Sequence, residues 1–435
     1  MKLSIKHLFI ISLILAAPFP WTIGVGNMEG LYLYEILTIL CLLYIILRNP
    51  HRNNIDFKVF NQHFLRFKKI SALLIIVIVT SVLINFVENI TNDNFDYSSV
   101  IKIVIHVVIS LLVLISAFVC GFLLFDGEKD LKKISYILFI SFFITTITTF
   151  IKWYNSTGGI ISRYNFEPPT GLGQGDTARI IILCFLFTIF LLANFKKNKL
   201  FLLLSLIITS ISIFIIQSRA SYVIFLVQFL LLSYLIVKDS QTKFKFKYFI
   251  LFLISVVFII GISYEIESVL GLFTNINENL LNTDSIETHN KLLVIKDGNR
   301  IFLDSPFWGV GWGNFGIHTT AFLEVSGSGY KVSTPHNGII QLLAETGIFG
   351  TFLALWISLI ILQYLYYQYR TNKIRSNKMF FGILLIIFII AIFSKLIVSS
   401  YLFPSPIIRN SIRLSFYHWF IVGYAFSFVK SKQFN

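Results

Sequence analysis

The chain has 435 residues, of which 56% are hydrophobic and only 13% charged, and its formal net charge is +15. Soluble globular domains carry about 25% charged residues, so this composition argues against a water-soluble enzyme and excludes a disordered chain or a disulfide-rich secreted scaffold. The lysines and arginines collect on one side of alternating apolar blocks, as the positive-inside rule describes for cytoplasmic loops. We therefore interpret the basic charge as a topology signal and expect no nucleic-acid partner.

Apolar blocks of about 17 to 25 residues, long enough to cross a bilayer as helices, follow one another along the chain. The sequence predicts twelve spans, at residues 7–24, 31–47, 70–87, 101–125, 134–152, 177–194, 200–216, 221–237, 247–263, 346–368, 380–398 and 412–429. We therefore expect an all-α, polytopic integral membrane protein with both termini in the cytoplasm. Lys2 and Lys6 before the first block resemble the start of a signal peptide, but no clear cleavage site follows, so we interpret this block as a retained span.

Two predicted outward connections are long. Residues 153–176 are rich in glycine and proline, and residues 264–335 form the larger connection. We expect the larger connection to be packed, because it contains five aromatic residues: Phe302, Phe307, Trp308, Trp312 and Phe315. The predicted organisation is therefore nine spans in 1–263, an extracytoplasmic loop subdomain with the catalytic element in 264–345, and three last spans in 346–435.

The sequence shows neither a metal-binding cysteine pattern nor a phosphate-binding loop that would indicate chemistry on the cytoplasmic side. Cys41, Cys120 and Cys184 lie inside apolar blocks without metal-ligand spacing, so we expect them to be small buried apolar residues. The cytoplasmic loops have neither a Walker pattern nor clustered histidines, which argues against an ATP-driven pump. Any chemistry is therefore expected on the outer face.

Few basic residues fall on the predicted outer side. Each one calls for an explanation, because lysine and arginine are disfavoured in loops that are transferred across the membrane. The outer arginines are Arg163, Arg179, Arg219, Arg300, Arg409 and Arg413. Two explanations stay open for each, namely extension of the side chain to lipid headgroups and bidentate binding of an anion such as a diphosphate. Arg219 lies in a link between two spans that is too short to form a loop, so we expect it at the outer membrane surface.

The segment that leads into the tenth span carries a histidine in a distinctive setting. Thr334 followed by Pro335 predicts an N-cap and a first helical residue, which would place His336 in the first turn. The positive end of a helix disfavours a charged imidazole, and a neutral histidine can act as a general base. A capping or headgroup-binding histidine is the alternative.

Upstream of this histidine, a proline is followed by three alternate glycines. The apolar run before Pro306 predicts a helix that stops there. Gly309, Gly311 and Gly313 predict a turn packed tightly against other backbone. No strand precedes these glycines, so a dinucleotide-binding fold is excluded.

Together these elements resemble a known family. The stretch Pro306–Phe315 and the stretch His336–Gly350 look like the shared domain of bacterial O-antigen ligases and O-antigen polymerases, and the Ser-Arg-Ala-Ser link at 218–221 is similar to that family's arginine element. The resemblance implies a GT-C-like membrane glycosyltransferase. Its donor would be a glycan on undecaprenyl diphosphate, presented at the extracytoplasmic face of the bacterial inner membrane.

The resemblance also implies roles for particular residues. His336 would be the catalytic base, with Asn337 beside it in the substrate site, and Arg219 would hold the diphosphate. A family arginine before the sixth span would correspond to Arg163 or Arg179. In this sequence those arginines are expected to take the place of a metal, and no cofactor is expected.

A second family arginine is displaced in this chain. Counting back from the proline motif reaches Lys291 rather than an arginine, and the nearest arginine is Arg300. Nine residues separate the two, so they would face opposite sides of a helix. Either Lys291 replaces the arginine, or Arg300 acts from a shifted register.

Two acceptors are compatible with the family. A polymerase transfers the glycan to another lipid-linked repeat unit, with a chain-length regulator as a further partner, whereas a ligase transfers it to lipid A–core. The short Pro-His-Asn entry, without a second histidine directly before it, favours a polymerase of O-antigen or capsule repeat units. A transporter of lipid-linked glycan is the alternative from another class, although it would need more polar residues along its spans.

Overall fold

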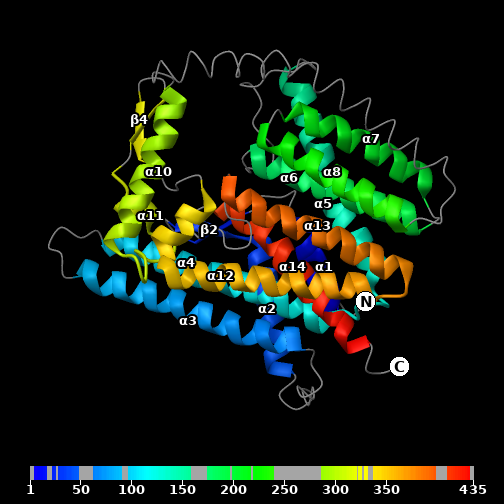
Figure 1. Ribbon diagram of the computed structural model, residues 1–435, viewed down its shortest axis with the longest axis horizontal. Coiled ribbons are helices and arrows are strands. Elements are labelled where there is room, and N and C mark those ends of the chain that lie inside the picture. The colour runs from blue at the N-terminus through cyan, green and yellow to red at the C-terminus, as the bar shows by residue number, and fades with distance from the viewer. Residues whose placement is uncertain are drawn as a thin grey trace.

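The computed structural model describes residues 4–16, 22–25, 28–48, 62–90, 97–157, 174–195, 198–216, 219–239, 286–320, 322–325, 328–331, 337–397 and 409–431. Within these ranges most of the chain is helical (Figure 1). The helices are α1 (Ile5–Ala16), α2 (Leu33–Arg48), α3 (Gln62–Ile90), α4 (Tyr97–Leu124), α5 (Leu131–Thr157), α6 (Gln174–Asn194), α7 (Lys199–Ile215), α8 (Arg219–Asp239), α10 (Ile286–Asp304), α11 (Phe315–His318), α12 (Gly338–Thr371), α13 (Arg375–Ile397) and α14 (Arg409–Ser431).

Ten of the twelve predicted spans coincide with these helices. Among the described residues, six helices are long and apolar enough to cross a membrane, namely α3, α4, α5, α6, α12 and α13, and α1, α2 and α7 are shorter apolar helices. The chain is therefore a helical membrane protein. The predicted span at 247–263 lies outside the described residues.

The first predicted span was too long, and its end is not helical. The helix stops at Ala16, and Thr22–Val25 (β1) pairs with Met28–Tyr32 (β2) in an antiparallel hairpin. The intervening sequence contains two prolines, which cannot donate helical hydrogen bonds. A second hairpin joins Phe322–Val325 (β3) to Ser328–Lys331 (β4), so the expectation of an all-α chain missed two short hairpins.

The centre of the bundle depends on close helix contacts. Helix α14 packs mainly on α4, and α12 packs on both α3 and α13. Glycines allow the first of these contacts, because a Cβ at Gly423 would overlap the carbonyl oxygen of Phe118 and one at Gly121 would overlap that of Phe420. Small residues at such positions are typical of membrane helix pairs. The three cysteines are buried, as predicted.

One end of the bundle, which we call the basic end, gathers the start of α1 and the ends of α12 and α14. Lys6 forms an ion pair of 2.7 Å with Asp130, in the turn 125–130 between α4 and α5. Tyr424 of α14 donates a hydrogen bond to the carbonyl oxygen of Gly127 in the same turn, and the carbonyl after Tyr424 accepts one from Tyr364 of α12. The start of α1 and the end of α14 lie at this same end of the bundle (Figure 1).

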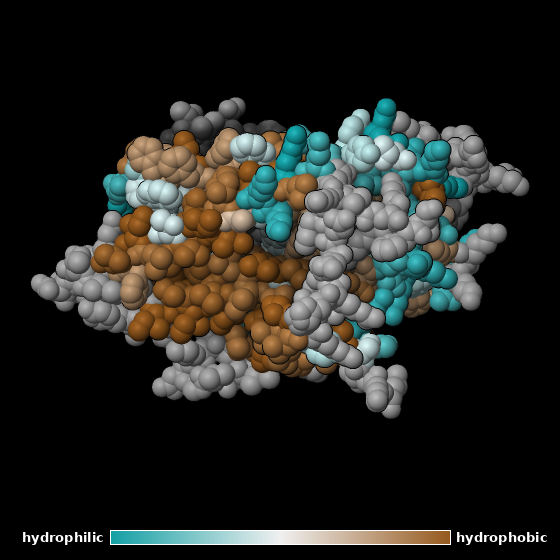
Figure 2. Space-filling view, turned by 90° about the horizontal axis from the view of Figure 1, so that it is seen from below, coloured by the Kyte–Doolittle hydropathy of each residue, from teal (hydrophilic) through white to brown (hydrophobic). Residues whose placement is uncertain are grey.

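A broad apolar band covers the face on which α3 lies (Figure 2). Exposed leucine, isoleucine and valine side chains of α3, such as Leu73, Ile76, Val79 and Leu83, point out of the fold. A surface of this kind is unfavourable in water and suits the lipid chains of a bilayer.

Candidate active site

Helix α12 is broken at Gly347, and a loop from upstream fills the break. The backbone of Gly347 has φ 62° and ψ −168°, so the usual hydrogen bond from the N–H of Ile348 to the carbonyl of Ala344 does not form. Instead the N–H of Ile348 donates to the carbonyl oxygen of Pro306 at 2.9 Å, and the carbonyl oxygen of Ala344 accepts from the N–H of Val310 at 2.8 Å. The loop therefore satisfies both backbone groups that the kink releases.

Glycines permit this contact between the two backbones. A Cβ at Gly309 would overlap the backbone of Glu345, and a Cβ at Gly347 would overlap the carbonyl group of Phe307. Gly309, Gly311 and Gly313 also have positive φ angles of 68°, 93° and 90°, a region that other residues rarely adopt. The predicted tight turn against other backbone is therefore confirmed.

Glu345 holds the far side of the glycine turn. Its side chain is fully buried, faces the backbone N–H groups of Gly313 and Phe315, and accepts a hydrogen bond of 3.3 Å from the side-chain amide of Gln341. The family motif thus places an acceptor opposite two backbone donors. This arrangement fixes the turn against the first half of α12.

Helix α3 contributes two polar residues to the same contact, and the sequence analysis missed both. The Ser81 hydroxyl donates to the carbonyl oxygen of Trp308 at 2.6 Å and lies 3.2 Å from that of Glu345. The side-chain amide of Asn85 donates to the carbonyl oxygen of Gly309 at 3.3 Å. Their signal in the sequence was polarity within an apolar span, which usually has a functional or packing reason.

The kink lies at one boundary of the membrane. Helices α3 and α12 run side by side from His63 and Tyr364, whose rings are 6.4 Å apart, to Ser81 and Glu345. The eighteen residues from His63 to Ser81 rise about 27 Å as a helix, close to the roughly 30 Å of a hydrocarbon core. Because Tyr364 belongs to the basic end, residues 305–314, which we call the docked loop, lie at the opposite membrane surface.

The start of α12 differs from the prediction. Asn337 is the N-cap, and its side-chain oxygen accepts hydrogen bonds from the N–H groups of Ile339 and Ile340, both at 3.1 Å. The predicted cap at Thr334 was therefore wrong, because an asparagine three residues later caps the helix. His336 itself lies outside the described residues, and it directly precedes the cap rather than standing in the first turn.

Helix α10 carries both candidates for the second phosphate ligand. Lys291 and Arg300 lie within one continuous helix, so their nine-residue separation places them on opposite faces. The guanidinium group of Arg300 forms ion pairs of 2.8 Å with Asp297 and 3.1 Å with Asp304, and it donates to the carbonyl oxygen of His318 at 2.9 Å. Arg300 therefore ties α10 to α11.

Asp297 is the centre of this connection. Its carboxylate accepts hydrogen bonds from the side chain of Thr319 and from both the backbone N–H and the hydroxyl of Thr320. Burial pushes the pKa of Asp297 upward, but the hydrogen bonds from Thr319, Arg300 and Thr320 outweigh that effect and hold the pKa below its ordinary value. The carboxylate is thus ionised at neutral pH.

The aromatic residues of this region divide into two groups. Trp312 and Phe315 are buried, as predicted. Phe307 and Trp308 are 60% and 38% exposed. Both lie beside Phe349, with ring centroids 5.9 Å and 5.5 Å away, so they form an aromatic patch at the membrane boundary, where such rings are favoured.

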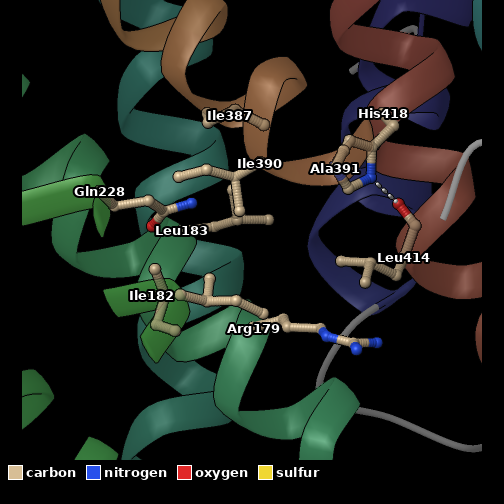
Figure 3. A pocket seen from close by; sticks show the side chains of 10 residues that line it. Arg179, Ile182, Leu183, Gln228, Ile387, Ile390, Ala391, Leu414 and His418 are labelled. Atoms are coloured by element: carbon tan, nitrogen blue, oxygen red, sulfur yellow. Dashed lines mark hydrogen bonds between the residues drawn. The ribbon is translucent and has the colours of Figure 1, made fainter. Parts of the chain in front are cut away.

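Arg179 is buried near one end of α6. It forms an ion pair of 2.7 Å with Asp176 and borders a cavity of about 30 Å³ between α6, α8, α13 and α14. In Figure 3, Gln228 and His418 lie on opposite walls of this cavity, while the guanidinium group of Arg179 extends past Leu414. The burial of Arg179 and its ion pair with Asp176 argue against extension to lipid headgroups.

Arg413 and Arg219 lie at the corresponding ends of α14 and α8. Arg413 is fully buried, and its guanidinium carbon lies 4.3 Å from the ring centroid of Tyr32. Arg219 is the first residue of α8, and α7 ends at Ile215, so the short link is confirmed. Arg163 lies outside the described residues.

In the part of the chain that the structure describes, no group of three histidine, cysteine, aspartate or glutamate residues could hold a metal ion. Arg179 and Arg413 are buried near the starts of α6 and α14. The ion pair of Arg179 with Asp176 and the ring contact of Arg413 with Tyr32 do not join either arginine to the docked loop.

Comparison with known proteins agrees with the motif resemblance. A family model described as O-antigen ligase matches residues 204–355. This range begins in α7, includes Arg219 and the docked loop, and ends just after the kink. It supports the O-antigen ligase and polymerase superfamily. None of the curated proteins compared matches the chain.

Proposed function

We propose that this chain, whose residues 204–355 carry the O-antigen ligase domain, is an extracytoplasmic glycosyltransferase of the bacterial inner membrane that polymerises surface-polysaccharide repeat units. The donor is a glycan on undecaprenyl diphosphate, and the acceptor is a second lipid-linked repeat unit. The observation that carries the proposal is the match over the docked loop, because its motif residues bring the start of α12 and the glycine turn together at a membrane boundary.

In the proposed mechanism the diphosphate is already a good leaving group, so the protein must stabilise its charge and activate a hydroxyl. His336 takes the proton from the acceptor hydroxyl, whose oxygen attacks the anomeric carbon and inverts its configuration. The carbon–oxygen bond to the diphosphate breaks, and lipid diphosphate leaves. Arg219 and Arg163 or Arg179 bind this group, while Asn337 supports the site through the helix cap.

The second phosphate ligand is proposed to be Lys291. Arg300 uses its guanidinium donors on Asp297, Asp304 and the backbone of His318, which favours an anchoring role. A lysine supplies charge without the bidentate fork of arginine.

The decisive experiment concerns His336. Purified wild type and His336→Ala are compared for glycan transfer from a lipid-linked donor and, separately, for donor binding. We expect the variant to lose about 10²–10⁴-fold in transfer rate, the usual range for a general base, with donor binding largely kept. Transfer within a few-fold of wild type would remove His336 from the mechanism, and a loss confined to binding would make it a phosphate ligand.

The ligase is the second candidate, favoured by the description of the matching family. It differs only in the acceptor, which would be lipid A–core. Offering the purified protein both acceptors with one donor separates the two, because a polymerase elongates the lipid-linked glycan and a ligase leaves its length unchanged.

A further inference from the structure

A long apolar groove opens between α3 and α4. Helix α3 packs mainly on α12, whereas α4 packs mainly on α14. Helices α3 and α4 therefore diverge. The resulting groove has a volume of about 450 Å³, and Ile357 of α12 and Trp419 of α14 line it together with both helices. Residues of this surface belong to spans that face lipid, so a lipid chain rather than water is its natural occupant.

Charge marks one end of the groove. Among the described residues that line it, Lys68 is the single charged one. Lys68 is exposed near the start of α3, and exposed Arg66 and Lys69 flank it. This start belongs to the basic end, because His63 packs beside Tyr364. Basic residues at a membrane surface attract anionic headgroups.

None of the described residues that line the opposite end of the groove is charged. Ile78 is the last residue of α3 along the groove, and the buried ring of Trp312 lines the same space. The ten residues from Lys68 to Ile78 rise about 15 Å as a helix, and Ile78 lies three residues before Ser81, which contacts the docked loop. The groove thus runs from the basic end to the docked loop.

We propose that this groove binds one anionic phospholipid of the leaflet at the basic end, with its headgroup on Lys68 and an acyl chain running up to Trp312. A lipid whose headgroup lies at the end near the docked loop is disfavoured, because no described lining residue there is charged. Lys68, at the other end, is the single charged one. The lipid fills the space between α3 and α4 and completes the packing around Trp312, which belongs to the docked loop. This proposal does not depend on the transfer reaction.

The test uses the full chain in nanodiscs of phosphatidylglycerol and phosphatidylethanolamine in equal amounts. After extraction into a mild detergent, native mass spectrometry counts the retained lipid. We expect one phosphatidylglycerol per chain, with retention reduced about fivefold in Lys68→Ala, the effect of losing one basic residue at a membrane surface.

A matched pair of variants separates groove binding from general lipid contact. Ala72→Phe fills the groove and should abolish retention, whereas Ile76→Phe adds bulk to the same helix outside the groove and should not. Equal retention of both lipids, or unchanged retention in Lys68→Ala and Ala72→Phe, would overturn the proposal. Displacement of phosphatidylglycerol by added undecaprenyl phosphate would also overturn it and assign the groove to the donor's chain.

Discussion

Replacing Gly347 by alanine challenges the docked loop directly. At φ 62° and ψ −168° a side chain is strained by about 1–3 kcal/mol, and its Cβ would overlap the carbonyl group of Phe307. If α12 straightens instead, it regains the hydrogen bond from the N–H of Ile348 to the carbonyl of Ala344. The carbonyl of Pro306 and the N–H of Val310 then lose their partners, and each unpaired buried group costs about 1–3 kcal/mol. Either route favours undocking by about 2–4 kcal/mol.

Hydrogen exchange measures this loss locally. The amide of Val310, which donates to Ala344, should exchange about 30- to 1,000-fold faster in Gly347→Ala, since about 1.4 kcal/mol corresponds to a factor of ten. Glycan transfer should fall with it. Gly175→Ala is the matched control, because a Cβ there has no neighbour within 4 Å and no change is expected. Unchanged protection of Val310 in the Gly347 variant would refute the docking argument.

Three further predictions concern charge and topology. Arg219→Lys should lose most transfer activity while inserting normally, because the bidentate contact is lost; near-normal glycan length in Arg219→Ala would instead make the residue a lipid anchor. Because the pKa of Asp297 is depressed in the folded state, its stabilising contribution is present above its ordinary pKa and is lost as pH falls through the folded value. As the pH is lowered, the free energy of unfolding of Asp297→Asn should therefore lack the loss that Asp297 causes in the wild type. Identical dependence of unfolding on pH in variant and wild type would contradict this prediction. A reporter fused at residue 300 should lie outside and one at residue 245 inside, and a cytoplasmic signal at 300 would reverse the proposed orientation.

Hydropathy was sufficient to place most helices, because each apolar block must satisfy its own backbone in lipid. It failed beyond Ala16, where prolines stop the helix and a hairpin follows. It also missed the cap at Asn337, because Thr334 and Pro335 gave an equally good local signal three residues earlier. A local sequence pattern cannot choose between two neighbouring candidate N-caps when hydrogen bonds from a single side chain decide where the helix starts.

The glycine motif predicted a tight turn but not its partner. Nothing in the sequence near Gly309 identifies the broken backbone at Gly347 or the polar pair Ser81 and Asn85, which are distant along the chain. The aromatic residues predicted a packed region but not which rings are exposed, as those of Phe307 and Trp308 are. These features depend on tertiary contacts, which periodicity does not encode.

The exchange of hydrogen bonds at the kink makes a closed ring of the chain between Val310 and Ala344. Lengthening such a ring costs little free energy, about 0.6 kcal/mol for each doubling of its length. Its two ends are fixed by backbone hydrogen bonds, which side-chain substitutions elsewhere do not remove. The hairpin β3–β4 lies inside this ring. Residues 321–335, which lie between Thr320 and the proposed base His336, can therefore be exchanged between homologues while the hydrogen bonds at the kink and those of Asp297 are kept.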